Sequence, residues 1–248
     1  MRALLRVVVA GAVALLLNAQ VVHAGESYYL LMFGAQRVPA NPDYSHTFAT
    51  FVRATWEGDG CCPQNPTLEA HTISWLPCNG VVRLVAFFPE TGRNFGLKET
   101  IRWSADNDMR VSIWGPYKIK RELYERAVAQ VANLESGQVR YKALDSGRPT
   151  DKVSNCIHAV SSLSQGFRLR VASPGWGETA SYFVLKELKP WICDTGVTHP
   201  WVGSALGLDE FCLIYRDYQN PNSGIVGPLF RVFGGERDLK ATMGPPVR

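Results

Sequence analysis

The chain has 248 residues, of which 46% are hydrophobic and 19% are charged, and its formal net charge at pH 7 is +4. This composition is that of a folded domain and excludes an intrinsically disordered protein. Both signs of charge are spread along the chain, which argues against a nucleic-acid-binding or membrane-surface protein.

The first 24 residues have the pattern of an export signal. Arg2 and Arg6 precede an apolar run over residues 7–17, and residues 22–24 fit a cleavage site. The apolar run is short for a membrane span, and no later segment is long and uncharged enough to be one. We therefore predict an exported product, located in the periplasm, the cell envelope or the extracellular space. An uncleaved N-terminal anchor is the alternative.

All six cysteines follow this signal, in a part of the chain that an oxidising compartment would receive. Disulfides are therefore expected, although the sequence leaves the pairing open among Cys61, Cys62, Cys78, Cys193 and Cys212. No CxxC pair or matching histidine pair is present, so no metal site is predicted. No glycine-rich phosphate loop follows a strand, so no cofactor is predicted either.

Alternating apolar residues and turn signals predict a mixed chain of strands and helices. Strands are expected at residues 27–34, 46–55, 71–76, 81–88 and 110–114, and the second and third of these read as an antiparallel pair. Helical spacing predicts a long helix over 118–134 and a short one over 156–163. Further strands are expected at 168–172, 182–188, 211–216 and 230–233.

The start of the short helix is the strongest candidate for chemistry. Asn155 is a good N-cap residue, which places Cys156 in the first turn, where unpaired N–H groups favour a thiolate. A nucleophilic thiol also needs a base, normally a histidine that a third polar group orients. His46 and His71 stand at the starts of the two paired strands and are the candidates for these roles.

This order of motifs resembles a known family. His46 in the run SHTFATF, His71 on a following strand, a long amphipathic helix and Cys156 in the run SNCIHAV are similar to the circularly permuted branch of the papain-like NlpC/P60 superfamily. That branch includes the lecithin retinol acyltransferase-like proteins and bacterial periplasmic domains with the same "HTF…NC" order. The resemblance covers roughly residues 28–165.

The resemblance implies both a fold and a function. The fold would be α+β, with a papain-like antiparallel sheet packed on helices and a C-terminal β-rich extension. Cys156 would be the nucleophile, His46 the base, His71 the orienting residue and Asn155 a group at the oxyanion or substrate. The enzyme would be a thiol hydrolase or acyltransferase acting through an acyl-enzyme on an envelope peptide or lipid.

The implied domain organisation has four parts. A signal peptide over 1–24 precedes a catalytic domain over 25–165 and a β-rich extension over 166–233 packed on the same domain. Residues 234–248 read as a loose tail.

Two alternatives remain open at this point, and His158 is assigned no role in catalysis. Cys156 could form a structural disulfide in a non-catalytic secreted binding domain. His158 lies about 200° around the helix from Cys156 and is expected to be structural. His199 would be the competing base, although Pro200 after it disfavours a base-bearing strand there.

Overall fold

The computed structural model describes residues 24–57, 65–145, 152–164 and 176–219, and these form a mixed α+β structure. The chain divides into two compact units, one of residues 1–26 with 54–68 and the other of residues 27–53 with 69–248. In the smaller unit, the ring of Trp56 covers Gly25. The following paragraphs concern the larger unit. The predicted signal peptide and the predicted tail lie almost entirely outside the described residues.

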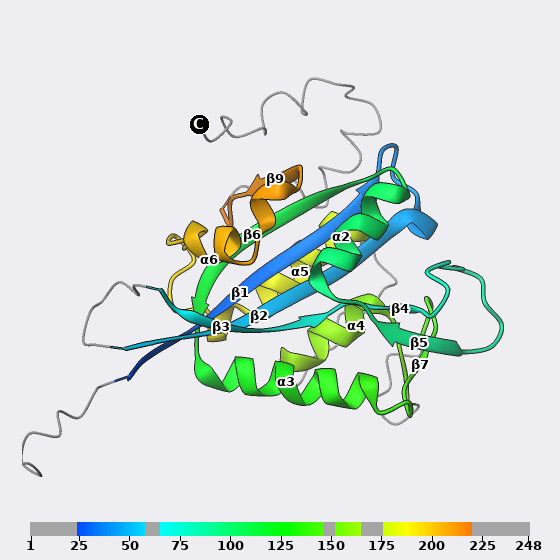
Figure 1. Ribbon diagram of the computed structural model, residues 1–248. Coiled ribbons are helices and arrows are strands. Elements are labelled where there is room, and N and C mark those ends of the chain that lie inside the picture. The colour runs from blue at the N-terminus through cyan, green and yellow to red at the C-terminus, as the bar shows by residue number, and fades with distance from the viewer. Residues whose placement is uncertain (1–23, 58–64, 146–151, 165–175, 220–248) are drawn as a thin grey trace, which may run out of the picture. The chain divides into compact units, whose positions relative to one another are not determined.

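The first sheet carries most of the core. Its strand order is β3 (Thr67–Ile73), β2 (Ser45–Glu57), β1 (Ala24–Arg37), β6 (Met109–Ile119) and β9 (Leu213–Arg216) (Figure 1). Strand β6 runs antiparallel to β1 and parallel to β9. Strands β2 and β3 are neighbours, as predicted for the segments 46–55 and 71–76. The predicted strand at 71–76 is divided at Ser74, because its first part ends β3 and its second part begins β4 of the other sheet.

A smaller second sheet is built from four short strands. Its order is β4 (Trp75–Pro77), β5 (Glu90–Asn94), β7 (Arg140–Tyr141) and β8 (Val153–Ser154). β5 is antiparallel to β4 and to β7, whereas β7 and β8 are parallel. Residues directly after β8 begin the helix that carries Cys156.

The described α-helices are α2 (Leu97–Asp106), α3 (Arg121–Glu135), α4 (Cys156–Ser161), α5 (Gly177–Glu187) and α6 (Pro200–Ala205). Short 3-10 turns occupy Pro42–Tyr44, Ser162–Ser164, Lys189–Trp191 and Leu208–Glu210. No helix in the described ranges has the length and apolar character needed to span a membrane.

Helices cover both faces of the first sheet. Figure 1 shows α2 on one side of the strands and α5 on the other. Residues Leu30 to Phe33 of β1 are completely buried, which follows because their side chains alternate between two covered faces. The sequence pattern of this strand is therefore a continuous apolar run.

Two glycines allow close approaches in this core. At Gly34 of β1, an added Cβ would lie 2.7 Å from the Cα of Glu178, so α5 packs directly on the strand backbone. At Gly115 of β6, φ is +93° and an added Cβ would lie 2.6 Å from the carbonyl oxygen of Leu30. The register between β1 and β6 shifts at this point, as in a β-bulge.

A buried ionic network fixes the start of α5 to the first sheet. The carboxylate of Glu178 accepts two hydrogen bonds of 2.9 Å from Arg110 of β6, from Nε and Nη2. It also accepts bonds from Ser112 Oγ at 2.6 Å and from Arg216 Nη2 at 3.4 Å. The side chain of Glu178 is only 1% exposed, so this network is shielded from solvent.

Several predicted elements agree with the structure and others do not. The strands predicted at 27–34, 46–55, 110–114 and 211–216 are present, and the long helix is present as α3. The predicted strand at 182–188 is wrong, because residues 182–187 belong to α5 and Leu188 is the C-cap of that helix. Eight residues of α5 are buried, and they include the polar residues Glu178, Thr179 and Ser181, so polar and apolar residues do not separate onto two faces of the helix.

The predicted strand at 81–88 is also wrong. This apolar run is an irregular loop between β4 and β5. Helix α2 was not predicted, and the described residues 176–219 contain two α-helices and one strand rather than a β-rich extension. The strands predicted at 168–172 and 230–233 lie outside the described residues. The α+β class is confirmed.

Candidate functional site

The site is built around the start of α4, where β8 ends. Asn155 has extended backbone angles, with φ −101° and ψ 179°, and its Oδ1 accepts a hydrogen bond of 2.8 Å from the backbone N–H of His158. Its Nδ2 donates to the carbonyl oxygen of Ala143 at 3.1 Å. Asn155 is therefore the N-cap that the sequence predicts, and Cys156 is the first residue of the helix.

Asp145 holds this helix start from a second direction. Its Oδ2 accepts a hydrogen bond of 3.0 Å from the backbone N–H of Asn155, and its Oδ1 lies 2.5 Å from Nδ1 of His158. The side chains of Asp145 and His158 are 0% and 3% exposed. His158 thus contacts a buried carboxyl group through its ring and the cap through its backbone. We call these three residues, Asp145, Asn155 and His158, the helix-start clamp.

Cys156 is half-buried as a residue, and its sulfur lies at the tip of α4. Burial raises the pKa of its thiol to about 11, and the nearby charge of Asp145 acts in the same direction. Hydrogen bonds from the backbone N–H groups of Thr47, Ile157 and Cys156 itself act in the opposite direction. Burial outweighs the thiolate stabilisation that the sequence predicts at a helix start, so the thiol is protonated at neutral pH.

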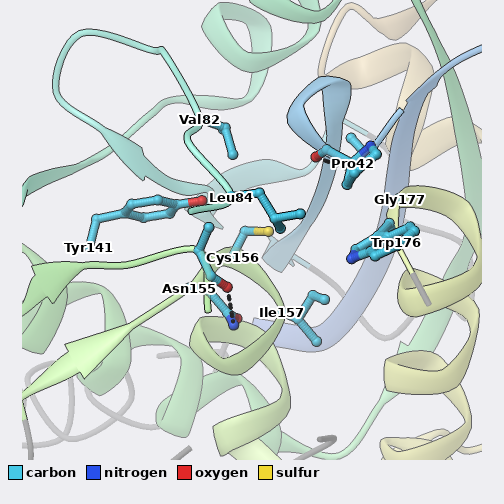
Figure 2. A pocket seen from close by; sticks show the side chains of 11 residues that line it. Pro42, Val82, Leu84, Tyr141, Asn155, Cys156, Ile157, Trp176 and Gly177 are labelled. Atoms are coloured by element: carbon cyan, nitrogen blue, oxygen red, sulfur yellow. Dashed lines mark hydrogen bonds between the residues drawn. The ribbon is translucent and has the colours of Figure 1, made fainter. Parts of the chain in front are cut away.

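A small pocket surrounds this sulfur. Its empty space, including the part open to solvent, is about 380 Å³. Figure 2 shows the sulfur pointing into the pocket, with Tyr141 on one side and Trp176 and Pro42 on the other. The remaining lining comes from Ser45, Val82, Leu84, Ala143, Asn155, Ile157 and Gly177. Apolar side chains therefore form most of the wall.

The structure places the ring of His46 away from this pocket. Its Nε2 lies 2.9 Å from Ser74 Oγ, and the ring stacks on Phe48 and meets the edge of Trp103 from α2. The hydroxyl of the next residue, Thr47, contacts Gly177 and Ser181 of α5 instead. Neighbouring side chains of a strand point to opposite faces of the sheet, so the imidazole of His46 lies on the face that α2 covers and the hydroxyl of Thr47 on the face that α5 covers. Strand β2 therefore contacts the Cys156 thiol through the backbone of Thr47 and not through the His46 ring.

His71 also lies elsewhere. Its Nε2 is 3.0 Å from Glu69 Oε1 on the same strand, and its ring meets the edge of Tyr124 from α3. Within the described ranges, no hydrogen bond joins Cys156 to His46 or to His71. The predicted Cys-His-His arrangement is therefore not assembled, because β2 and β3 direct these rings to other neighbours.

His199 is the N-cap residue of α6. Its ring meets the edge of Tyr29 with the ring centroids 5.1 Å apart, and its backbone N–H donates to Pro116. The helix start explains why Pro200 is tolerated here, since the first helical position needs no N–H. The pocket lining does not include this residue.

The described cysteines are free thiols. Cys78, Cys193 and Cys212 are exposed, and Cys156 is half-buried. The disulfides that the sequence predicts are therefore not formed among these four residues. Cys61 and Cys62 lie outside the described residues.

Because His46 is buried, we predict that the stability of the protein depends on pH. Desolvation lowers its pKa from 6.5 to about 3, so the folded protein keeps this imidazole neutral while the unfolded chain takes up a proton below pH 6.5. Stability is therefore lost as the pH falls. We expect His46 to reduce the free energy of unfolding by about 1.4 kcal/mol per pH unit between pH 6 and pH 4.

Urea denaturation at a series of pH values measures this effect. His46→Gln keeps a hydrogen-bonding group for Ser74 but does not titrate, so the variant should have a shallower slope of stability against pH than the wild type. Equal slopes would contradict the prediction.

Sequence reasoning missed several members of this site. Tyr141 lies in β7 and Asp145 four residues after it, and Thr47 contributes through its backbone. In the sequence, Asp145 is indistinguishable from an exposed loop residue, because the burial of a carboxyl group produces no pattern among neighbouring residues. The Asn155-Cys156 pair was found because N-capping is a local signal.

Comparison with known proteins adds no relative: no protein-family model, no curated protein and no solved structure matches the chain.

Proposed function

We propose that the chain is an exported thiol-dependent hydrolase or acyltransferase in which Cys156 accepts an acyl group from an ester or amide of an envelope molecule. The observation that supports this proposal most directly is the thiol of Cys156, the first residue of α4, in a pocket with mainly apolar walls. The backbone N–H groups of Thr47 and Ile157 already point at the sulfur and would stabilise a thiolate there.

The apolar wall favours a lipid acyl group over a cell-wall peptide. Val82, Leu84 and Ile157 offer no charged partner for the carboxylates and amines of a peptide. In the proposed reaction the sulfur attacks the acyl carbonyl carbon, and a thioester forms. The thiol proton leaves with the alcohol or amine, and water or an acceptor amine then takes the acyl group and restores the thiol.

A non-catalytic binding domain is the second candidate. The raised pKa of Cys156 and the contacts of His46 with other groups favour it. In this case the pocket would hold an apolar group without covalent chemistry.

Labelling with an alkylating reagent and with an ester distinguishes the enzyme from the binding domain. At pH 8 a thiol with a pKa of about 11 reacts with iodoacetamide roughly 100-fold more slowly than a thiol with the ordinary value. Iodoacetamide should therefore label exposed thiols such as Cys193 before Cys156. A medium-chain p-nitrophenyl ester should reverse this order if the pocket binds acyl groups, and peptide mass spectrometry identifies the acylated residue.

Matched variants complete the test. Cys156→Ser should abolish the ester adduct, and Cys193→Ser should leave it unchanged. Acylation that follows the iodoacetamide order, with Cys156 last, would support the binding domain and reject the enzyme.

A further inference from the structure

The loop between β4 and β5, residues 78–89, exposes large apolar side chains. Val85, Phe87 and Phe88 are 78%, 85% and 83% exposed, and Val81 is 51% exposed. Single exposed apolar residues are common on proteins, but four within eight residues form a patch of the kind that marks an interaction surface. Figure 1 shows this loop extending away from β4 and β5.

The inner side of the loop is anchored to the core. Val82 and Leu84 alternate with the exposed residues and pack against the hydrophobic core. The backbone N–H of Leu84 also donates to Asp43 Oδ1 at 3.2 Å. The exposed side chains are therefore displayed from a fixed inner edge.

Basic side chains surround the exposed tip. Arg83 is an exposed member of the loop. Lys142 Nζ donates to the carbonyl oxygen of Phe87 at 3.4 Å, and Arg140 Nη2 donates to that of Pro89 at 3.3 Å. Asp43 lies on the inner side of the loop, and Glu90, which directly follows the loop, is half-buried. Exposed aromatic rings beside cations are the combination that binds an interface of anionic lipids.

We propose that the β4–β5 loop docks the protein on the surface of a lipid bilayer that contains anionic lipids. Phe87 and Phe88 enter the headgroup boundary, and Arg83, Arg140 and Lys142 face the lipid phosphates. This surface is local, which is why the nearly balanced charge of the whole sequence gives no indication of it. The proposal does not depend on chemistry at Cys156, although Val82 and Leu84 of the same loop also line that pocket.

Vesicle co-sedimentation of the exported full-length product tests the proposal. The vesicles contain phosphatidylcholine alone or phosphatidylcholine with phosphatidylglycerol, and every variant keeps the same N-terminus. Phe87→Ser with Phe88→Ser should weaken binding at least about tenfold. Arg140→Gln with Lys142→Gln should weaken binding to the anionic vesicles roughly tenfold and change binding to the neutral vesicles little.

Matched controls show whether vesicle binding depends on this loop. Val197→Ser and Tyr215→Ser remove exposed apolar side chains elsewhere and should bind as the wild type does. Cys156→Ser should also bind normally, so a failure of the proposed chemistry leaves the docking result intact. An unchanged melting temperature shows that the Phe87 and Phe88 variants are folded.

Two results would overturn the proposal. One is equal vesicle binding by the wild type and the double phenylalanine variant. The other is an absence of vesicle binding together with a dimer, seen by size-exclusion chromatography, that the phenylalanine substitutions dissociate. That second result would assign the loop to a contact between copies of the chain.

Discussion

Glu178→Ala should lower the free energy of unfolding by about 3–5 kcal/mol, because it removes the carboxylate that two buried guanidinium groups share. The side chains of Arg110 and Arg216 are only 13% and 5% exposed, so water cannot replace the lost carboxylate fully. Ser112 loses its acceptor as well. Equilibrium urea denaturation measures the change.

An exposed ion pair provides the matched control. Arg121 and Glu125 lie one turn apart on α3, with side chains 65% and 56% exposed. Glu125→Ala should cost no more than about 0.5 kcal/mol. A triple variant, Arg110→Met with Glu178→Leu and Arg216→Met, should recover part of the loss, because it replaces the whole charged network with apolar contacts. Similar losses for Glu178→Ala and Glu125→Ala would show that the network is hydrated.

The second large effect is expected at the helix-start clamp. Asp145→Ala removes the acceptor for the backbone N–H of Asn155 and the ring partner of His158, both of them buried. Unsatisfied buried polar groups predict a loss of about 2–4 kcal/mol in the free energy of unfolding. Denaturation of the variant checks this value.

A conservative variant separates the effect of Asp145 on protein stability from its effect on the pKa of the Cys156 thiol. Asp145→Asn keeps a hydrogen-bond acceptor for Asn155 but removes the charge that helps to raise the pKa of Cys156. The pKa of the thiol should therefore fall, and iodoacetamide should label Cys156 faster at pH 8 than in the wild type. Slower labelling in a folded Asp145→Asn variant would contradict this electrostatic role.

Local patterns explain the successful sequence predictions. The alternation in β2, the helical spacing in α3 and the N-cap at Asn155 depend on neighbouring residues only. Helix α5 was not predicted because polar residues such as Glu178 and Ser181 lie among its buried residues, which hides the helical spacing of its apolar residues. The strand predicted at 81–88 is absent for a different reason, since no described strand pairs with it and five of its eight residues are exposed.

The candidate site was predictable only in part. Cys156 could be singled out because a helix start is a local feature. The directions of His46 and His71 could not be obtained in this way, since they depend on which helix covers each face of the sheet. The contacts of Asp145 with Asn155 and His158 depend on the path of the chain between β7 and β8, which has no signature in residue order.

The first turn of α5 joins two parts of the molecule that differ in chemistry. Trp176 and Gly177 form one wall beside the thiol, and the next residue, Glu178, is held by the arginines of β6 and β9. Gly34 lets this turn lie directly on the strand backbone. The position of the pocket wall in front of the sulfur therefore depends on the ion pairs of Glu178 with Arg110 and Arg216. These arginines do not line the pocket, yet substituting them would change which molecules the pocket can hold.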